Sequence, residues 1–133
     1  MTETINGIEW LYAVVDGTAE ITGIQKTTAG AVTIPSTLGG RPVKSIGWVA
    51  FAGCHALTSV TIGNGVEGIR NGAFKGCRAL VSVTIPDGVT WIGDWAFSDC
   101  SALKVVSLPR RFEGKIDESV FSDCAKDLKI EYR

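Results

Sequence analysis

The 133-residue chain lacks an excess of charge of either sign: thirteen basic and fourteen acidic residues leave a net charge of −1. Binding to nucleic acid or to an anionic membrane surface depends on a basic face, so neither is expected. No apolar run approaches the roughly 20 residues that span a bilayer, so membrane insertion is not expected either. Met1–Trp10 has no basic segment before an apolar core. No signal peptide is therefore predicted, and a native start at Met1 would place the protein in the cytoplasm.

Residues suited to acid–base catalysis are scarce. The single histidine, His55, stands at a variable position that Arg78 and Ser101 occupy in later copies of a repeat, which indicates a surface residue. No pair of carboxylates recurs at a useful spacing, and Gly63-Asn64-Gly65 lacks the Lys-Ser/Thr of a phosphate-binding loop. We therefore expect no enzyme, no catalytic residue and no cofactor.

What the chain does have is an internal repeat, built on Ala-Phe or Val-Phe, two residues, then Cys. The Phe and Cys positions advance by 23, 23 and 24 residues. A period of this length is typical of a solenoid, in which each repeat closes one coil and stacks on the next. The four copies are Ala50–Cys54, Ala73–Cys77, Ala96–Cys100 and Val120–Cys124.

A short strand follows each of the first three cysteines. Ser59–Ile62, Ser82–Ile85 and Val105–Leu108 alternate in side-chain character, which predicts strands with one buried face. Equivalent strands of successive coils run in the same direction, so a parallel sheet is expected. The inward residues are predicted to be Val60, Ile62, Val83, Ile85, Val106 and Leu108. Only a helical turn fits in each of the segments 48–53, 71–76 and 94–99.

The ends of the chain are expected to cap the coils. Asp16-Gly17 between two apolar stretches predicts a hairpin in residues 1–24. A degenerate repeat is expected in residues 25–45, core repeats in 46–109, and a capping repeat in 110–133. This makes one domain of about four and a half coils. Twelve charged residues lie between Arg110 and Arg133, as suits a polar cap on an open sheet edge.

These motifs resemble the BspA-like (Treponema pallidum-type) leucine-rich repeats. The likeness covers about residues 19–133 and is carried by Ile92-Gly93, Ala96-Phe97, Cys100 and Leu103, and by the strand end Val83-Thr84-Ile85-Pro86. It implies an α/β repeat solenoid of mainly parallel strands, coiled right-handed, with the sheet on a concave face. It also implies a bacterial cell-surface or secreted protein that binds host or matrix proteins.

The four cysteines do not match a metal site. Zinc ligands usually come in closely spaced pairs, whereas these cysteines are one coil apart. Cβ atoms stacked at the strand spacing of about 4.8 Å are also farther apart than the roughly 3.8 Å of a disulfide. We expect a ladder of buried thiols beside a ladder of phenylalanine rings, and no metal.

The best candidate for a binding site is the outward face of the predicted sheet. Its side chains are mostly small and uncharged, and its hydroxyls can donate and accept hydrogen bonds. Serine and threonine also simply suit exposed strands, so both interpretations stand. The predicted protein-binding residues are Ser59, Thr61, Ser82, Thr84, Val105, Ser107, Lys129 and Glu131.

Trp48, Trp91 and Trp95 support an alternative, because neighbouring repeats have no aromatic residue at those positions. They are candidates for glycan stacking or for contact with a protein partner. Partial burial along the coil edge, or packing of Trp91 beside Trp95, would also explain them. A third alternative is a structural or self-associating unit, in which a homodimer covers one end of the short solenoid.

Overall fold

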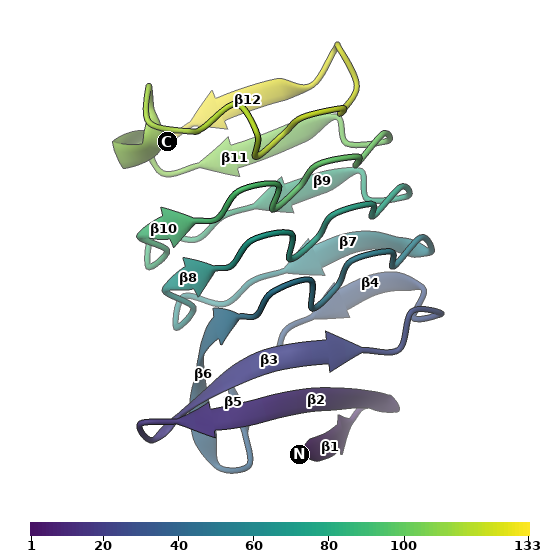
Figure 1. The fold of residues 1–133 in the computed structure, drawn as a ribbon, viewed down its shortest axis with the longest axis vertical. Coiled ribbons are helices and arrows are strands. Elements are labelled where there is room, and N and C mark those ends of the chain that lie inside the picture. The colour runs from purple at the N-terminus through teal and green to yellow at the C-terminus, as the bar shows by residue number, and fades with distance from the viewer.

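The computed structural model describes residues 1–133 as a column of coils with the N-terminal hairpin at one end (Figure 1). Two sheets form its sides. The hairpin sheet has the order β1-β2-β3-β6-β8-β10, with β5 beside β6, and the repeat sheet has the order β12-β11-β9-β7-β4. The strands are β1 Thr2–Ile5, β2 Ile8–Val15, β3 Thr18–Ile24, β4 Gly30–Thr33, β5 Thr37–Leu38, β6 Arg41–Ile46, β7 Leu57–Thr61, β8 Gly68–Ile69, β9 Ser82–Thr84, β10 Trp91–Ile92, β11 Val105–Leu108 and β12 Lys129–Tyr132.

The repeat sheet confirms the predicted parallel solenoid. Its strands pair in parallel and in register, so that Val60, Val83, Val106 and Ile130 form one inward column. All six residues predicted to face inward are buried. The sheet has five strands because β4 pairs along its whole length with β7, which completes the coil that the sequence indicated only in part.

A stack of phenylalanine rings runs through the core. Phe51 and Phe74 have ring centroids 4.8 Å apart with planes 5° from parallel, and Phe74 and Phe97 are 5.1 Å apart at 2°. Phe121 continues the stack at 5.7 Å from Phe97. These separations match the strand spacing of about 4.8 Å, as expected when equivalent side chains of successive coils lie in one column. The predicted ring ladder is confirmed.

The N-terminal hairpin closes one end of that stack. The predicted turn at Asp16-Gly17 is present, with φ of 52° and 80°, and joins antiparallel β2 and β3. Trp10 of β2 is 1% exposed and meets the ring of Phe51 edge-on, at a centroid distance of 6.1 Å. The additional strand β1 was not predicted, although Asn6-Gly7 makes the same kind of turn.

The helical content is smaller than expected. A single 3-10 turn, η1 (Arg110–Phe112), is present, and the segments expected to hold a helical turn are irregular turns instead. Each of these segments contains residues in the left-handed region, which interrupts a helix. Val49, Gly72 and Trp95 have φ of 49°, 67° and 58° at one equivalent position. The structure contains no helix with the length and hydrophobicity that a membrane span requires.

Candidate functional site

The predicted protein-binding residues form two columns on the outside of the repeat sheet. The register places Ser59, Ser82, Val105 and Lys129 in one column, and Thr61, Thr84, Ser107 and Glu131 in the other. We call these eight residues the hydroxyl face. The pairing of β4 with β7 adds Ala31 beside Ser59 and Thr33 beside Thr61, and the sequence interpretation missed both. The sequence match between Val32-Thr33-Ile34-Pro35 and Val83-Thr84-Ile85-Pro86 could have indicated that they belong to a further strand of the repeat sheet.

The N-terminal half of the hydroxyl face is hollowed and uncharged. A shallow depression of about 290 Å³ lies over β7 and β9, lined by Ser59–Ile62 and Ser82–Thr84. The hydroxyls of Ser59, Thr61, Ser82 and Thr84 make no hydrogen bond within the chain. These four groups are therefore available to donate and accept hydrogen bonds to a ligand.

The C-terminal part of the hydroxyl face is different, because Arg133 reaches back across it. One guanidinium nitrogen donates to Ser107 Oγ at 2.6 Å, and the other donates to the Ile85 carbonyl and to Asp87 Oδ1 at 3.0 Å. Ser107 thus has an internal partner that the sequence did not indicate. Lys129 and Glu131 are exposed and bring opposite charges to this end of the face.

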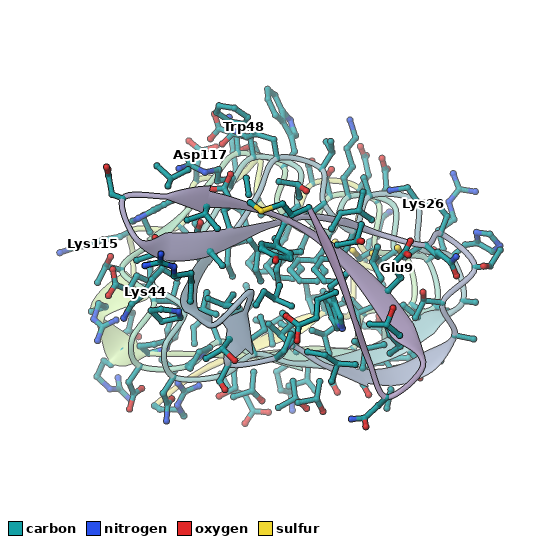
Figure 2. The ribbon with its side chains drawn as sticks, turned by 90° about the horizontal axis from the view of Figure 1, so that it is seen from below. Glu9, Lys26, Lys44, Trp48, Lys115 and Asp117 are labelled. Carbon is teal, nitrogen blue, oxygen red and sulfur yellow. The ribbon has the colours of Figure 1, made fainter.

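The three candidate tryptophans lie elsewhere, near β8 and β10 of the hairpin sheet. The exposed fractions are 65% for Trp48, 41% for Trp91 and 50% for Trp95. Trp48 projects outward from the coil (Figure 2). The Arg70 guanidinium lies over two of the indoles, 5.2 Å from the ring centroid of Trp48 and 5.3 Å from that of Trp91. Cation–π attraction therefore holds both indoles against Arg70.

Polar contacts fix Arg70 beside the two indoles. Its Nε donates to Glu20 Oε1 at 2.5 Å, and Ser45 Oγ donates to the same oxygen at 2.8 Å. The indole of Trp91 lies across Gly68, since a Cβ at Gly68 would be 2.0 Å from Trp91 Cζ2. Trp91 thus packs on Arg70 and Gly68. Among the aromatic contacts of the chain, none joins Trp91 to Trp95.

A second hollow, of about 370 Å³, begins at Trp91 and runs toward the last coil. It exists because β10 is the edge of the hairpin sheet, with an irregular segment and no strand beside it in the last coil. Its apolar lining includes Trp91, Phe112 and Ile116, and its charged lining consists of Arg111, Lys115 and Asp117. The Arg111 guanidinium also donates to the carbonyl oxygens of Val89 and Asp87, so it is held against the preceding coil.

The cysteines form a ladder of free thiols, of which Cys54, Cys77 and Cys100 are buried as predicted, whereas Cys124 in the last coil is only partly buried. Three of them donate a hydrogen bond to a phenylalanine carbonyl of the preceding coil, at 3.1 to 3.2 Å. Burial raises the pKa of Cys77 to about 12, and it also raises the pKa of Cys54, Cys100 and Cys124. Such thiols are protonated and unreactive at neutral pH, since the thiolate is the nucleophile and metal ligand.

No group of three or more histidine, cysteine, aspartate or glutamate side chains is placed to hold a metal ion. His55 is exposed, with Nδ1 3.2 Å from the carbonyl oxygen of Gly53 in its own turn. Asp99 and Asp123 are turn residues, with φ of 58° where the first two copies have Gly53 and Gly76 at 75°.

Comparison with known proteins identifies the repeat. A family model described as the BspA type leucine rich repeat region matches residues 25–132 in six copies. A leucine-rich repeat protein from Bacteroides capillosus is 28% identical, with a TM-score of 0.80 over 99% of this chain and 98% of that one. No curated protein matches the chain.

Two longer proteins contain a similar solenoid. A leucine rich cell surface protein from Faecalibacterium prausnitzii is 27% identical, with a TM-score of 0.67 over 100% of this chain and 43% of that one. A leucine-rich repeat protein from Eubacterium ventriosum is 24% identical, with a TM-score of 0.62 over 92% of this chain and 39% of that one. The chain therefore spans less than half of either protein.

Proposed function

The chain belongs to the BspA-type leucine-rich repeat family, and on that premise we propose that it is a non-enzymatic module that binds another protein through the hydroxyl face. The family resemblance implies that the parallel repeat sheet lies on the concave side of the coil. A partner seated there would contact several coils at once, since each coil contributes two outward side chains at a constant spacing.

One observation carries the proposal: the four free hydroxyls of Ser59, Thr61, Ser82 and Thr84 surround one shallow depression. Small side chains let a partner approach the strands closely, and unpaired hydroxyls provide hydrogen bonds that can be matched on the partner. Residues that served only as exposed strand formers would not need to be this small in both columns.

The partner we propose is an extracellular host or matrix protein, and the compartment is the cell surface or the medium. The support is the likeness to the cell surface protein of F. prausnitzii, which shares 27% identity over the whole of this chain. The family resemblance points in the same direction.

A double variant of the depression tests the proposed face. Ser82→Arg with Thr84→Arg fills the hollow with two long cations while changing only outward side chains of β9. Thr22→Arg, at an exposed position of β3 in the hairpin sheet, is the matched control. Binding to a panel of purified extracellular-matrix proteins should be lost in the double variant and kept in the control. Equal binding by both proteins would refute the proposed face.

Glycan binding by the tryptophans is the second candidate. Trp95 has φ of 58° at a position where the preceding coil has Gly72, a conformation that is costly for a bulky residue, and its side chain is 50% exposed. A role in recognition would explain why this strained, exposed aromatic is kept. On a glycan array, Trp95→Ala should lose any signal that the wild-type protein gives, while the Ser82→Arg/Thr84→Arg variant should keep it.

A further inference from the structure

The repeat sheet ends in an open strand. β12 pairs in parallel with β11 on one side and has no strand on the other. The N–H groups of Lys129 and Arg133 donate to Lys104 and Leu108 carbonyls on the β11 side. Successive backbone groups of a strand point to opposite edges, so those of Ile130 and Tyr132 face the open edge. These groups are a template for another strand.

The core is also open at this end. Phe121, Leu128, Ile130 and Tyr132 are only partly buried, whereas their counterparts one coil earlier are 0% exposed. The counterparts are Phe97, Leu103, Val106 and Leu108. The last coil therefore leaves apolar surface that a further layer would cover, and covering it would favour association.

The sequence of this segment indicates that a second copy of the same segment can form that layer. Asp127-Leu128-Lys129-Ile130-Glu131-Tyr132-Arg133 is its own antiparallel complement. When two copies pair with Ile130 opposite Ile130, Lys129 of each copy faces Glu131 of the other. Leu128 then faces Tyr132, and Asp127 faces Arg133. Every outward pair joins opposite charges and every inward pair is apolar, which is the favourable case for cross-strand neighbours.

Other registers of the same two strands lose this match. Centring the pair on Glu131 sets Glu131 opposite Glu131 and Lys129 opposite Arg133. Centring it on Lys129 sets Lys129 opposite Lys129 and Asp127 opposite Glu131. A shift by a single residue turns inward side chains against outward ones. Like charges directly opposite are unfavourable, so one register is selected.

We propose that two copies of this chain form a symmetric dimer by antiparallel pairing of β12 with β12, centred on Ile130. The two five-stranded repeat sheets join into one continuous sheet, and the open ends of the two cores cover each other. Such an interface is isologous, so it closes as a dimer and does not grow into a fibre.

The backbone groups on the open edge of β12 can form the hydrogen bonds that this pairing requires. Each Ile130 N–H donates to the Ile130 carbonyl of the other copy, and each Tyr132 N–H donates to the Leu128 carbonyl of the other copy. The Leu128 N–H stays with its own partner, the Ala125 carbonyl at 3.1 Å. The long bond of 3.3 Å from Arg110 to the Tyr132 carbonyl is exposed and does not involve the N–H groups that pair.

Lys129 and Glu131 form the charge pairs that decide the register. Both are exposed, and neither makes a salt bridge within its own chain. Asp127 and Arg133 contribute less, because Asp127 lies 3.8 Å from Lys104 and Arg133 lies 3.0 Å from Asp87 in the same chain. Charges on an edge strand usually prevent pairing. Here the alternation of sign makes them complementary.

Charge reversal tests the dimer and its register together. The mass of the 133-residue protein is measured by sedimentation equilibrium over about a hundredfold concentration range, which gives the dimer dissociation constant. Glu131→Lys sets Lys129 against a second lysine, and Lys129→Glu sets Glu131 against a second glutamate. Each single variant should raise the dissociation constant about tenfold or more, because two attractive pairs become repulsive.

Two combinations of these substitutions restore opposite charges at positions 129 and 131 across the interface. The Lys129→Glu/Glu131→Lys double variant should dimerise as the wild type does, and an equimolar mixture of the two single variants should form a heterodimer. Circular dichroism and urea denaturation of each variant show that it is folded. A wild-type protein that stays monomeric throughout, or a Glu131→Lys variant that dimerises unchanged, overturns the proposal. The readout is mass, so the outcome is independent of the proposed ligand-binding function.

Discussion

The thiol of Cys77 donates a hydrogen bond to the carbonyl oxygen of Phe51, which lies 3.1 Å away in the preceding coil. The same contact recurs one coil later, from Cys100 to Phe74. In both cases the carbonyl is buried with its coil, and the sulfur is 0% exposed. Cysteine thus has two roles here: it fills the space of a small apolar residue and it provides a weak donor between coils.

Alkaline pH should weaken the fold through these thiols. Below about pH 9 the Cys77 thiol is protonated in both the folded and the unfolded chain. Between pH 9 and its folded pKa of about 12, only the unfolded chain loses the proton. The unfolded state then binds fewer protons, so the free energy of unfolding falls as pH rises, by about 1.4 kcal/mol per pH unit for each such thiol.

Urea denaturation of the wild type and of Cys77→Ala measures this effect. The two unfolding free energies should run parallel from pH 6 to pH 8, and the difference between them should change by about 2 kcal/mol near pH 10.5. The wild type should show the steeper loss. Parallel curves up to pH 11 would mean that the buried thiol does not resist ionisation.

Loss of a central ring should cost far more than loss of the terminal one. Phe74 is 0% exposed and stacks on a ring at each side, whereas Phe121 is partly exposed and stacks only on Phe97. We expect Phe74→Ala to lower the free energy of unfolding by about 3–5 kcal/mol, and Phe121→Ala by clearly less than half of that. Urea denaturation gives both values. Comparable losses at the two positions would contradict a core in which each coil depends on its neighbours.

One buried hydroxyl should be replaceable with a gain in stability. Ser98 is 2% exposed, and its Oγ has no hydrogen-bond partner. The equivalent residue of the first copy is Ala52. Because burying an unpaired hydroxyl is unfavourable, Ser98→Ala should raise the free energy of unfolding by about 1 kcal/mol.

Ser122, the equivalent residue one coil later, is the matched control for Ser98. Its Oγ donates to the Ser119 carbonyl at 3.0 Å, so Ser122→Ala removes a hydrogen bond and should be neutral or destabilising. Thermal unfolding followed by circular dichroism compares the two variants. A lower melting temperature for Ser98→Ala would show that the hydroxyl has a partner after all.

The periodic features of the molecule could be predicted from the sequence. Val60, Val83 and Val106 recur at one period, so their common direction and the register of the repeat sheet follow from alignment alone. The aspartates at 99 and 123 could be assigned to turns for the same reason, because glycine occupies that position in other copies.

Features that occur once in the chain were harder to predict. The Arg133 side chain reaches Asp87 and Ser107 because it is long and lies at the end of the sheet, and no other repeat has a counterpart. The prediction of helical turns was wrong because a residue in the left-handed region interrupts each segment. At Val49 and Trp95 the residue type gives no indication of that conformation.

The contact between Trp91 and Gly68 could have been predicted from the alignment of the repeats. The two residues share one column of the hairpin sheet, so a residue without a side chain lies directly beside a large aromatic one. In this position Gly68→Ala places a Cβ within the indole ring, and Trp91 must leave its site against Arg70. We expect a loss of about 1 kcal/mol in the free energy of unfolding, from the displaced indole and the weakened cation–π contact.

A double-mutant cycle separates this clash from any general effect of alanine at Gly68. In the Trp91→Ala background the space is empty, so Gly68→Ala should be neutral or stabilising by about 0.4–1 kcal/mol, since it restricts the unfolded chain. The double variant is then more stable than the sum of the two single effects predicts, and urea denaturation of the four proteins measures this difference. If Gly68→Ala has the same effect in both backgrounds, the indole of Trp91 does not lie across Gly68 in solution.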